Sequence, residues 1–581
     1  MIAPLFQLLL LSAPSPFRRY QIRRFAATVL GMAKSEEKKH DVAIHWFRNG
    51  LRFHDNPCLL DACQKSESLL PIYVVDPEFP FAQTAGCRAG TIRANFLLES
   101  INEVDEKLRK MGSQLVVVLG KSHEVLPEIV ATTQAKALFY EQEAAAPVRE
   151  QDAETIQAIK NRLKRDGKNY ECKFEAYATH TLHPMERYLA QCKDHTAPST
   201  YGSFTKIFNK MSVAKEVNEV KEVPSLPNKS VKLLEKSFAE ALRMPTLKDL
   251  GYAAAADDMK NSGKGGYAFA GGENAAIELL AKNMARSQWV ATFEKPKTSP
   301  NDATRPSTTA LSPYVKHGCI SPRRFYHELS KVYSKYNSKE TSKPPVSLHG
   351  QLMWRDFNYL VGYSTPNFDK MIDNPIARQI PWDDDPDLLL AWKMSKTGYP
   401  YIDAIMTQLR ETGWIHHLAR HSVACFLTRG DLWQSWEDGA TVFEEYLIDA
   451  DWSINNFNWQ WLSCTAHFYQ YFRCYSPIAF GKKTDPNGDY IRKWLPQFKD
   501  MPAKYIYEPW EAPIELQKKV GVIVGENYPH PIVDHKLVSK NNMSRMKEAY
   551  DAQKNREPMP ANESHSSGLN RDTSPKRQRR N

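Results

Sequence analysis

The sequence has few cysteines, and their spacing matches no common metal or redox motif. Its 581 residues include 9 cysteines, an odd number, and no pair has the CxxC spacing. This argues against a disulfide framework and a cysteine-rich zinc site, and makes a reducing compartment the default expectation. No apolar run approaches the roughly 20 residues that a transmembrane helix needs, so no membrane partner is expected.

Two common nucleotide-binding motifs are also absent. Gly120, Lys121 and Ser122 follow an apolar run and suggest a P-loop, but Leu115 stands where the first glycine of that motif belongs. No GxGxxG follows any predicted strand, which argues against a dinucleotide bound at a Rossmann turn.

Positive charge is in slight excess, with 77 Lys and Arg against 67 Asp and Glu. The excess suits a polyanionic partner, although tails and solvated surfaces explain it equally well. Residues 1–40 contain several arginines and no acid before Glu36, which indicates either an organellar transit peptide or a disordered leader with Met32 as the start. Residues 536–581 are predicted to be a disordered basic tail. The basic cluster at 575–580 is typical of nuclear import, so we expect a nuclear protein, with a plastid or mitochondrion as the alternative.

Residues 41–175 show the pattern of an α/β domain. Short apolar runs at 42–47, 69–75, 115–119 and 137–140 predict buried parallel strands, and residues 91–111 predict a crossover helix. This alternation is typical of a Rossmann-like parallel sheet. Residues 176–244 are rich in proline and lysine and are interpreted as a connecting segment.

Residues 245–535 predict an all-α domain. Helices are expected at 273–289, 322–333, 348–359, 403–409, 415–427 and 439–447. Eleven of the 13 tryptophans lie at or after Trp354, which is more indole than a helical core needs. Packing explains any single tryptophan, but this excess calls for a further function.

Three polar clusters interrupt the apolar character of this half. Hydroxyls at 307–312 precede a predicted helix, where they can cap the helix or hold phosphate oxygens. His417 and His421 share a helix face, as two zinc ligands would. Leu418, however, stands where HExxH zinc sites have a glutamate. The two remaining interpretations are a structural histidine pair and a proton donor with its partner. Asp449 and Asp451 lie in an apolar stretch, where a carboxylate needs a charged or hydrogen-bonding partner to stay ionised, and Arg420 is a candidate for that partner.

Several segments resemble the animal-type cryptochrome and (6-4) photolyase branch of the cryptochrome/photolyase family. The segments are 414–421 (WIHHLARH), 426–433 (FLTRGDLW), 449–455 (DADWSIN), 398–408 (GYPYIDAIMTQ) and 484–493 (TDPNGDYIRK). Residues 45–52, together with Asp55, Asn56 and Pro57, are similar to the start of the family's antenna domain. The resemblance covers residues 41 to about 535.

The resemblance implies a non-covalent, U-shaped FAD in the helical domain and an antenna chromophore of folate or deazaflavin type. The positions that match the family's FAD-binding residues are Thr308, Thr309, Leu311, Ser312, Gln351, Arg355, His417, Arg420, Asp449, Asp451 and Asn455. Asn455 matches the position facing flavin N5, and Arg420 and Asp449 match a buried ion pair beside the ring.

The resemblance also assigns an electron relay and a DNA-facing surface. Trp459, Trp436 and Trp382 match the family's relay triad and Trp433 its fourth tryptophan; the spacing of Trp433 and Trp436 predicts that both lie on one helix. Residues that match DNA-facing or lesion-pocket positions are Lys295, Trp354, Arg473 and Tyr475.

Two functions fit this resemblance. The first is blue-light repair of (6-4) photoproducts in UV-damaged DNA, with His417 and His421 handling the proton. The alternative is a cryptochrome photoreceptor that binds clock transcription factors, or both functions in one protein. Lys295 and Arg473 favour repair, whereas residues 456–458 (NFN) depart from the small Ala-Gly pair that the family pattern predicts.

Overall fold

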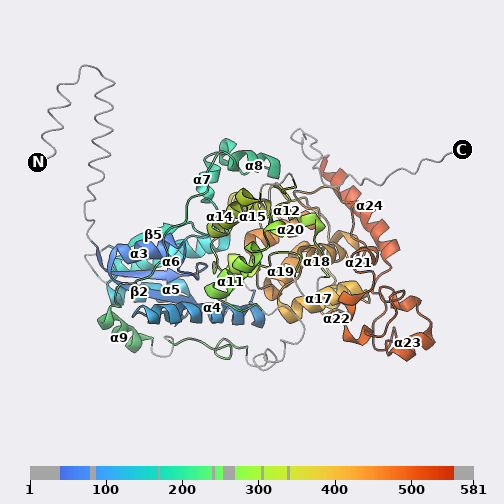
Figure 1. The fold of residues 1–581 in the computed structure, drawn as a ribbon, viewed down its shortest axis with the longest axis horizontal. Helices are drawn as coiled ribbons and strands as arrows, with labels where there is room; N and C mark the ends of the chain where they lie inside the picture. Colours follow the sequence, from blue (N-terminus) through green and yellow to red (C-terminus); the bar gives the residue numbers. More distant parts are fainter. Residues whose placement is uncertain are drawn as a thin grey trace, which may run out of the picture.

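The computed structural model describes residues 39–554, apart from 79–86, 166, 168–170, 239–242, 253–268, 302–305 and 337–339. An α/β body and a helical body lie side by side (Figure 1). The predicted leader up to residue 38 and the basic cluster at 575–580 lie outside the described residues. Within the described ranges, none of the helices combines the length and apolar character that crossing a bilayer requires.

The predicted parallel sheet is confirmed, with five strands in the order β3-β2-β1-β4-β5. The strands are β1 (His40–Phe47), β2 (Ser66–Val75), β3 (Val116–Leu119), β4 (Ala137–Glu141) and β5 (Lys173–Tyr177). Every pair is parallel, and β1 is the centre, since Ala43 pairs with both Leu69 and Ala137. β5 was not predicted because no residue of this edge strand is fully buried, so it shows no apolar run.

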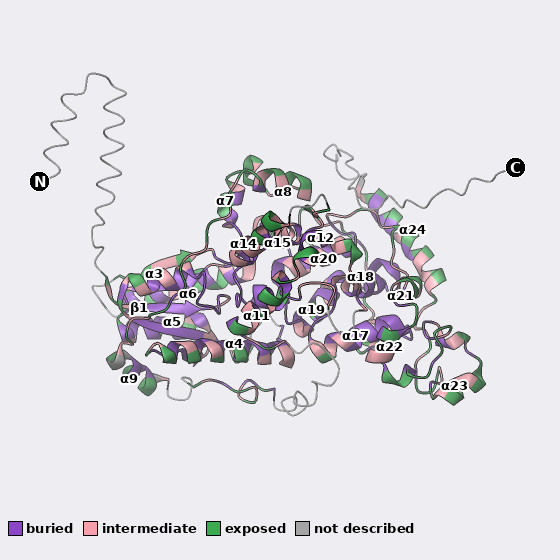
Figure 2. Ribbon diagram, in the orientation of Figure 1, coloured by how far each residue is buried: buried purple, intermediate pink, exposed green. Residues whose placement is uncertain are grey.

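Helices cover both faces of the sheet because successive strand residues point to opposite sides. The covering helices are α3 (Pro57–Gln64), α4 (Thr91–Lys110), α5 (Ser122–Thr133) and α6 (Ala146–Arg165). Ile44 and Val118 pack in one cluster with α5 and α6 residues, whereas Ala43 and Val117 pack in another with α3 and α4 residues. Figure 2 shows the strands around β1 largely buried.

In its described residues the connecting segment contains three short α-helices, α7 (Met185–Leu189), α8 (Tyr201–Phe208) and α9 (Asn228–Ser237). Phe204 of α8 packs on Phe357 of the helical body with ring centroids 5.4 Å apart. Leu234 of α9 is fully buried in the cluster that contains α5. The segment therefore contacts both bodies.

The helical body contains most of the predicted helices. Its longer helices are α11 (Glu273–Met284), α14 (Pro322–Lys335), α15 (Leu348–Ser364), α16 (Pro386–Lys393), α17 (Pro400–Thr412), α18 (His417–Cys425), α19 (Trp436–Tyr446) and α20 (Trp452–Leu462). The helix predicted at 273–289 is interrupted, because α11 ends at Met284 and α12 (Ser287–Thr292) starts after a turn. Likewise, α18 ends at Cys425 and gives way to a π-helical turn, η4 (Phe426–Gly430).

The prediction of a disordered tail from residue 536 is wrong for its first part. Residues His535–Lys554 form α24, which lies along the helical body (Figure 1). Met546 and Tyr550 are buried in one cluster with Trp433 and Cys464. These buried side chains recur at helical spacing within a polar sequence, and the sequence pattern alone did not reveal what they pack against.

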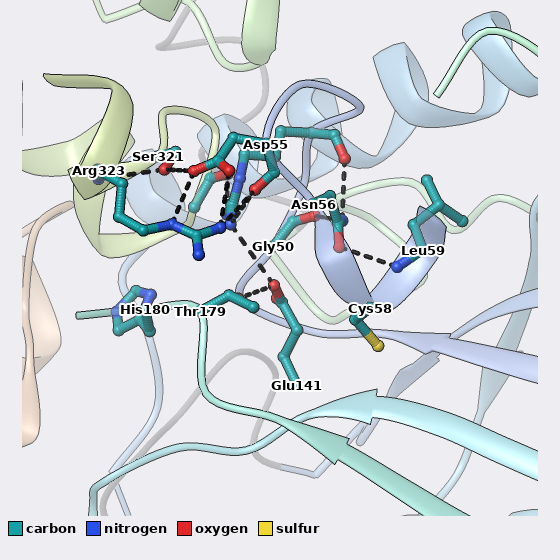
Figure 3. A network of polar contacts seen from close by, with 12 residues as sticks. Gly50, Asp55, Asn56, Cys58, Leu59, Glu141, Thr179, His180, Ser321 and Arg323 are labelled. Atoms are coloured by element: carbon teal, nitrogen blue, oxygen red, sulfur yellow. Dashed lines mark hydrogen bonds and ion pairs between the residues drawn. The ribbon is translucent and has the colours of Figure 1, made fainter. Parts of the chain in front are cut away.

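A buried polar network joins the two bodies (Figure 3). Asp55 accepts hydrogen bonds from Nε and Nη2 of Arg323, at 3.0 and 2.7 Å, and from the Ser321 hydroxyl. Arg52 donates to the Gly318 carbonyl at 3.0 Å, and His54 pairs with Glu273. The segment that resembles the start of the antenna domain thus holds the helical body against the sheet.

Candidate functional site

The histidine pair lies at the start of α18. The rings of His417 and His421 are 5.8 Å apart with planes at 80°, and Nδ1 of His421 lies 3.1 Å from the Tyr475 hydroxyl. All three residues are half-buried, whereas Ala419 on the same helix is fully buried. The structure therefore brings together three residues that the sequence assigned to one pocket. Among the residues it describes, no cluster of His, Cys, Asp and Glu could hold a metal ion.

Burial and neighbouring cations keep both imidazoles neutral. Burial, followed by the charges of Lys295, His416 and Arg420, lowers the pKa of His421 to about 3. Burial, followed by the charge of Lys295, lowers the pKa of His417 well below its usual value. Burial also lowers the pKa of Lys295 to about 8. An anionic ligand placed among these groups would raise the pKa of each histidine, since opposite charge favours the protonated form.

Arg420 and Asp449 form the predicted ion pair. Nη2 of Arg420 lies 3.0 and 2.9 Å from the two carboxylate oxygens of Asp449, and Nε donates to the Ile415 carbonyl at 3.0 Å. The Asp449 side chain is buried, while that of Arg420 is 24% exposed. The pair joins α18 to the loop before α20, and it leaves part of the Arg420 side chain accessible.

Asp451 caps α20 and connects it to two other segments. Its side chain accepts from the Ile454 amide at 3.0 Å and from the Tyr359 hydroxyl, and Nζ of Lys316 lies 3.8 Å away. One turn along the helix, Nδ2 of Asn455 donates to the Ala440 carbonyl at 2.9 Å, which fixes the orientation of the amide. Lys316 links α20 to the hydroxyl-rich segment.

That hydroxyl-rich segment does not serve as a helix cap. Leu311 occupies the N-cap position of α13 (Ser312–Lys316), so within this described stretch no side chain caps the helix. Instead, Ser312 accepts from the indole Nε1 of Trp414 at 3.3 Å, and the Thr309 carbonyl accepts from Asn283 at 2.9 Å. Thr308 and Thr309 remain half-buried beside the α18 region.

Two predicted FAD-binding residues contact other groups. Arg355 is buried and donates to the His180 carbonyl at 2.5 Å and to the Tyr359 hydroxyl at 3.2 Å. Through the Tyr359 hydroxyl it is linked to Asp451. Gln351 donates to the Pro345 carbonyl at 3.0 Å.

The donor set fits FAD. Contacts between residues far apart in the sequence bring together the three segments 307–316, 414–421 and 449–455. Trp414 donates a hydrogen bond to Ser312, and Lys316 lies beside Asp451. Together they present hydroxyls, an amide and a partly exposed guanidinium, while the residues between them are buried. Hydroxyl, backbone and cationic groups suit a diphosphate, and the Asn455 amide suits a polar ring.

Three of the four tryptophans of the predicted relay, Trp433, Trp436 and Trp459, are buried in the helical body, and Trp382 is half-buried. Trp459 and Trp436 are 2% and 0% exposed, and the rings of Trp382 and Trp433 lie 4.9 Å apart. Trp433 has a positive φ of 56° and precedes α19, which begins at Trp436. The prediction that Trp433 and Trp436 lie on one helix is therefore wrong, and Trp433 packs against Trp382 instead.

Two residues that the sequence predicts to face DNA, Trp354 and Arg473, are half-buried and exposed, respectively. Trp354 stacks on Tyr201 with ring centroids 4.1 Å apart and contacts Trp461 edge-on at 5.8 Å. Arg473 is exposed and follows Phe472, which is 59% exposed. An exposed aromatic beside an exposed arginine suits contact with nucleic acid.

Sequence reasoning missed two residues that support this site. Arg429 is buried and donates to the carbonyls of Leu462, Tyr471 and Arg473 at 2.8, 2.6 and 2.9 Å. Gly439 lies against Trp459, and a Cβ there would lie 2.2 Å from the indole ring. Arginine and glycine are common on surfaces and in turns, so neither position carried a signal by itself.

Comparisons with known proteins agree with this geometry. The profile described as "DNA photolyase" matches residues 43–225, and that described as "FAD binding domain of DNA photolyase" matches 347–548. The chain is 45% identical to the (6-4)DNA photolyase of Arabidopsis thaliana over 87% of this chain and 88% of that protein. It is 42% identical to Cryptochrome-1 of Sylvia borin over 87% of this chain and 78% of that protein.

A solved structure shares the fold. The cryptochrome of a Synechocystis species superposes with a TM-score of 0.71 at 26% identity, covering 87% of this chain and 99% of that one. The α/β body and the helical body are thus common to related proteins. The chain belongs to the cryptochrome/photolyase family, and FAD is its cofactor.

Proposed function

We propose that the protein repairs (6-4) photoproducts in DNA under blue light. The observation that carries the proposal is the half-buried pair His417 and His421 with Tyr475 at one side and Lys295 nearby. The 45% identity to a protein named (6-4)DNA photolyase supports it. Lesion DNA is the substrate, and exposed Arg473 binds its phosphates.

The cofactor is held by this chain's own polar groups. Thr308, Thr309 and Ser312 bind the diphosphate, and Arg420, kept in place by Asp449, faces the ring system together with Asn455. Reduced FAD, when bound, supplies one electron to the lesion after it absorbs light. The apolar residues around these groups exclude water from the site.

His417 gives a proton to the lesion, which would otherwise return the electron. Both histidines are neutral in the absence of anions, so the proton must be taken up when negative charge arrives. Phosphates of the lesion strand, drawn in by Lys295, raise the pKa of His417 and make it a donor near neutral pH. His421, hydrogen-bonded to Tyr475, holds the adjacent part of the lesion.

The tryptophans restore the electron supply. Trp459, Trp436, Trp382 and Trp433 pass electrons inward from the surface of the helical body, where Trp382 is half-buried. Indoles are suited to this because their rings are large and lie in a packed core.

A photoreceptor role is the second candidate. Relatives at 42% identity are named cryptochromes, and α24 offers an exposed helix with Leu537 at 59% exposure. In this role light changes which proteins the chain binds, with clock transcription factors as partners, and the proton-handling histidines serve no repair step.

Repair of (6-4) and cyclobutane-dimer oligonucleotides under blue light tests the proposal. His417→Ala should lower (6-4) repair at least about 100-fold, as expected for loss of general acid catalysis, with FAD content retained. His123→Ala, at a surface position of α5 that is remote from the site, is the matched control. Near-normal repair by His417→Ala would exclude the proton-donor role. If the flavin of the wild-type protein is photoreduced but the protein repairs neither lesion, the repair function is excluded and the photoreceptor role is favoured.

A further inference from the structure

Trp433 is enclosed by the C-terminal helix. Its ring is 1% exposed and shares a buried cluster with Met546, Ala549 and Tyr550 of α24. Asn542 of the same helix donates to the Asp431 carbonyl at 3.1 Å, and Tyr550 donates to the Cys464 carbonyl at 2.6 Å. The outer tryptophan is therefore covered by an element close to the end of the described chain.

One side chain of α24 lies directly on the indole. The guanidinium carbon of Arg545 is 4.3 Å from the centroid of the Trp433 ring. Asp383 holds the guanidinium there through two hydrogen bonds of 2.8 and 2.5 Å, and Nη2 also lies 3.4 Å from the Pro381 carbonyl. Arg545 is a fixed charge on this face of the ring, since a bidentate pair orients both groups.

The environment of Trp433 differs from that of the other relay tryptophans. Its Nε1 donates to the Pro381 carbonyl at 2.8 Å, whereas the indole nitrogens of Trp382, Trp436 and Trp459 have no hydrogen-bond partner among the described residues. A carbonyl acceptor stabilises the indole after it loses an electron. A cation on the ring face favours the neutral indole and opposes the positive charge of the oxidised one.

We propose that Arg545 is a positioning residue that controls how readily Trp433 gives up an electron. In each turnover one electron leaves Trp433 for Trp382 and the inner tryptophans. The indole keeps its N–H proton, because its partner is a carbonyl that cannot take one. A thiol reductant in solution then returns an electron to Trp433. Arg545 slows the outward movement of the positive charge and shields one face of the ring.

This inference rests on the proposed electron relay, and photoreduction of the oxidised flavin in the presence of a thiol tests it. Arg545→Gln should raise the rate about two- to fivefold, the factor that corresponds to one exposed cation–π contact. Lys547→Gln is the matched control, because it removes an equal charge from an exposed position of the same helix. In a Trp433→Phe background, Arg545→Gln should change nothing.

Hydrogen exchange of the α24 amides in the dark separates electrostatics from a merely structural role. Arg545→Gln and Arg545→Lys both lose the bidentate contact with Asp383, so both should speed exchange by about two- to fivefold. Only Arg545→Lys keeps the charge, so its photoreduction rate should stay near that of the wild type.

Three outcomes are decisive. If Arg545→Lys accelerates photoreduction as much as Arg545→Gln, loosening of the helix explains the effect and the inference is overturned. If Arg545→Gln leaves the rate unchanged while Trp433→Phe slows it, the inference fails and the relay stands. If Trp433→Phe has no effect, the relay through Trp433 is itself wrong.

Discussion

Gly439 tests how tightly the helical body encloses the innermost tryptophan of the proposed relay. It lies in α19, and a Cβ at this position would lie 2.2, 2.4 and 2.7 Å from three carbons of the Trp459 six-membered ring. Carbon atoms pack at about 3.5–4.0 Å, so the ring would have to retreat by roughly 1 Å or more. Phe443, 5.0 Å away, and Trp392, 6.3 Å away, occupy the neighbouring space.

The expected loss of stability follows from two opposing effects. Overpacking a core costs about 1–3 kcal/mol, and so short a contact belongs at the upper end of that range. Alanine is a better helix former than glycine by about 1 kcal/mol. Gly439→Ala should therefore destabilise the protein by about 2 kcal/mol, which is about 30-fold in the folding equilibrium.

Urea unfolding and flavin photoreduction together check this prediction. Gly202→Ala is the matched control, since its Cβ would meet nothing within 4 Å and it lies in the helix α8. That control should stabilise the protein by about 0.5–1 kcal/mol. Displacement of Trp459 should also slow photoreduction in Gly439→Ala alone. Equal stability of the two variants would refute the packing argument.

Two further predictions concern the loop around Arg473 and the attachment of α24. Arg429→Met removes the guanidinium donor from three carbonyls, of which that of Tyr471 keeps only a weak bond from the Cys474 thiol. It should therefore cost about 3 kcal/mol and speed trypsin cleavage at Arg473; unchanged cleavage would contradict it. Burial lowers the pKa of His535, but its hydrogen bond to Asp431 outweighs this and raises it. The protonated His535 should therefore stabilise α24 most near pH about 6.5, and this effect should be lost as pH rises through the elevated pKa of His535. Burial also raises the pKa of Asp431 to about 6, so the charged pair weakens again at lower pH. Hydrogen exchange of the α24 amides, measured at pH 6 and 9 and corrected for intrinsic rates, should show this loss of protection in the wild type and not in His535→Gln.

Apolar periodicity was sufficient for the elements that bury a continuous surface. Strands β1 to β4 are mostly buried, including β3 at one edge of the sheet, so each appears as an apolar run in the sequence. The other edge strand, β5, has exposed Lys173 and Ala176 and no fully buried residue, so it lacks that signal. Local sequence therefore predicts an element only when the element itself is enclosed.

The family motifs identified the site residues, but not how they are arranged. The sequence named Arg420 and Asp449 as partners, and they are 29 positions apart and paired in the structure. It placed Trp433 on the helix of Trp436 by spacing alone. The π-helical turn after α18 instead leads into a loop at Trp433, which turns the indole towards Trp382.

The sequence by itself determined the two-part fold, the family and the kinds of side chain available to FAD, because apolar patterning and long motifs are local. Only the tertiary structure decided the charge state of His417 and His421, the cover that Arg545 and α24 form over Trp433, and the contact of Gly439 with Trp459. Each of these depends on groups far apart in the chain, since burial and electrostatic interactions are set by neighbours in space.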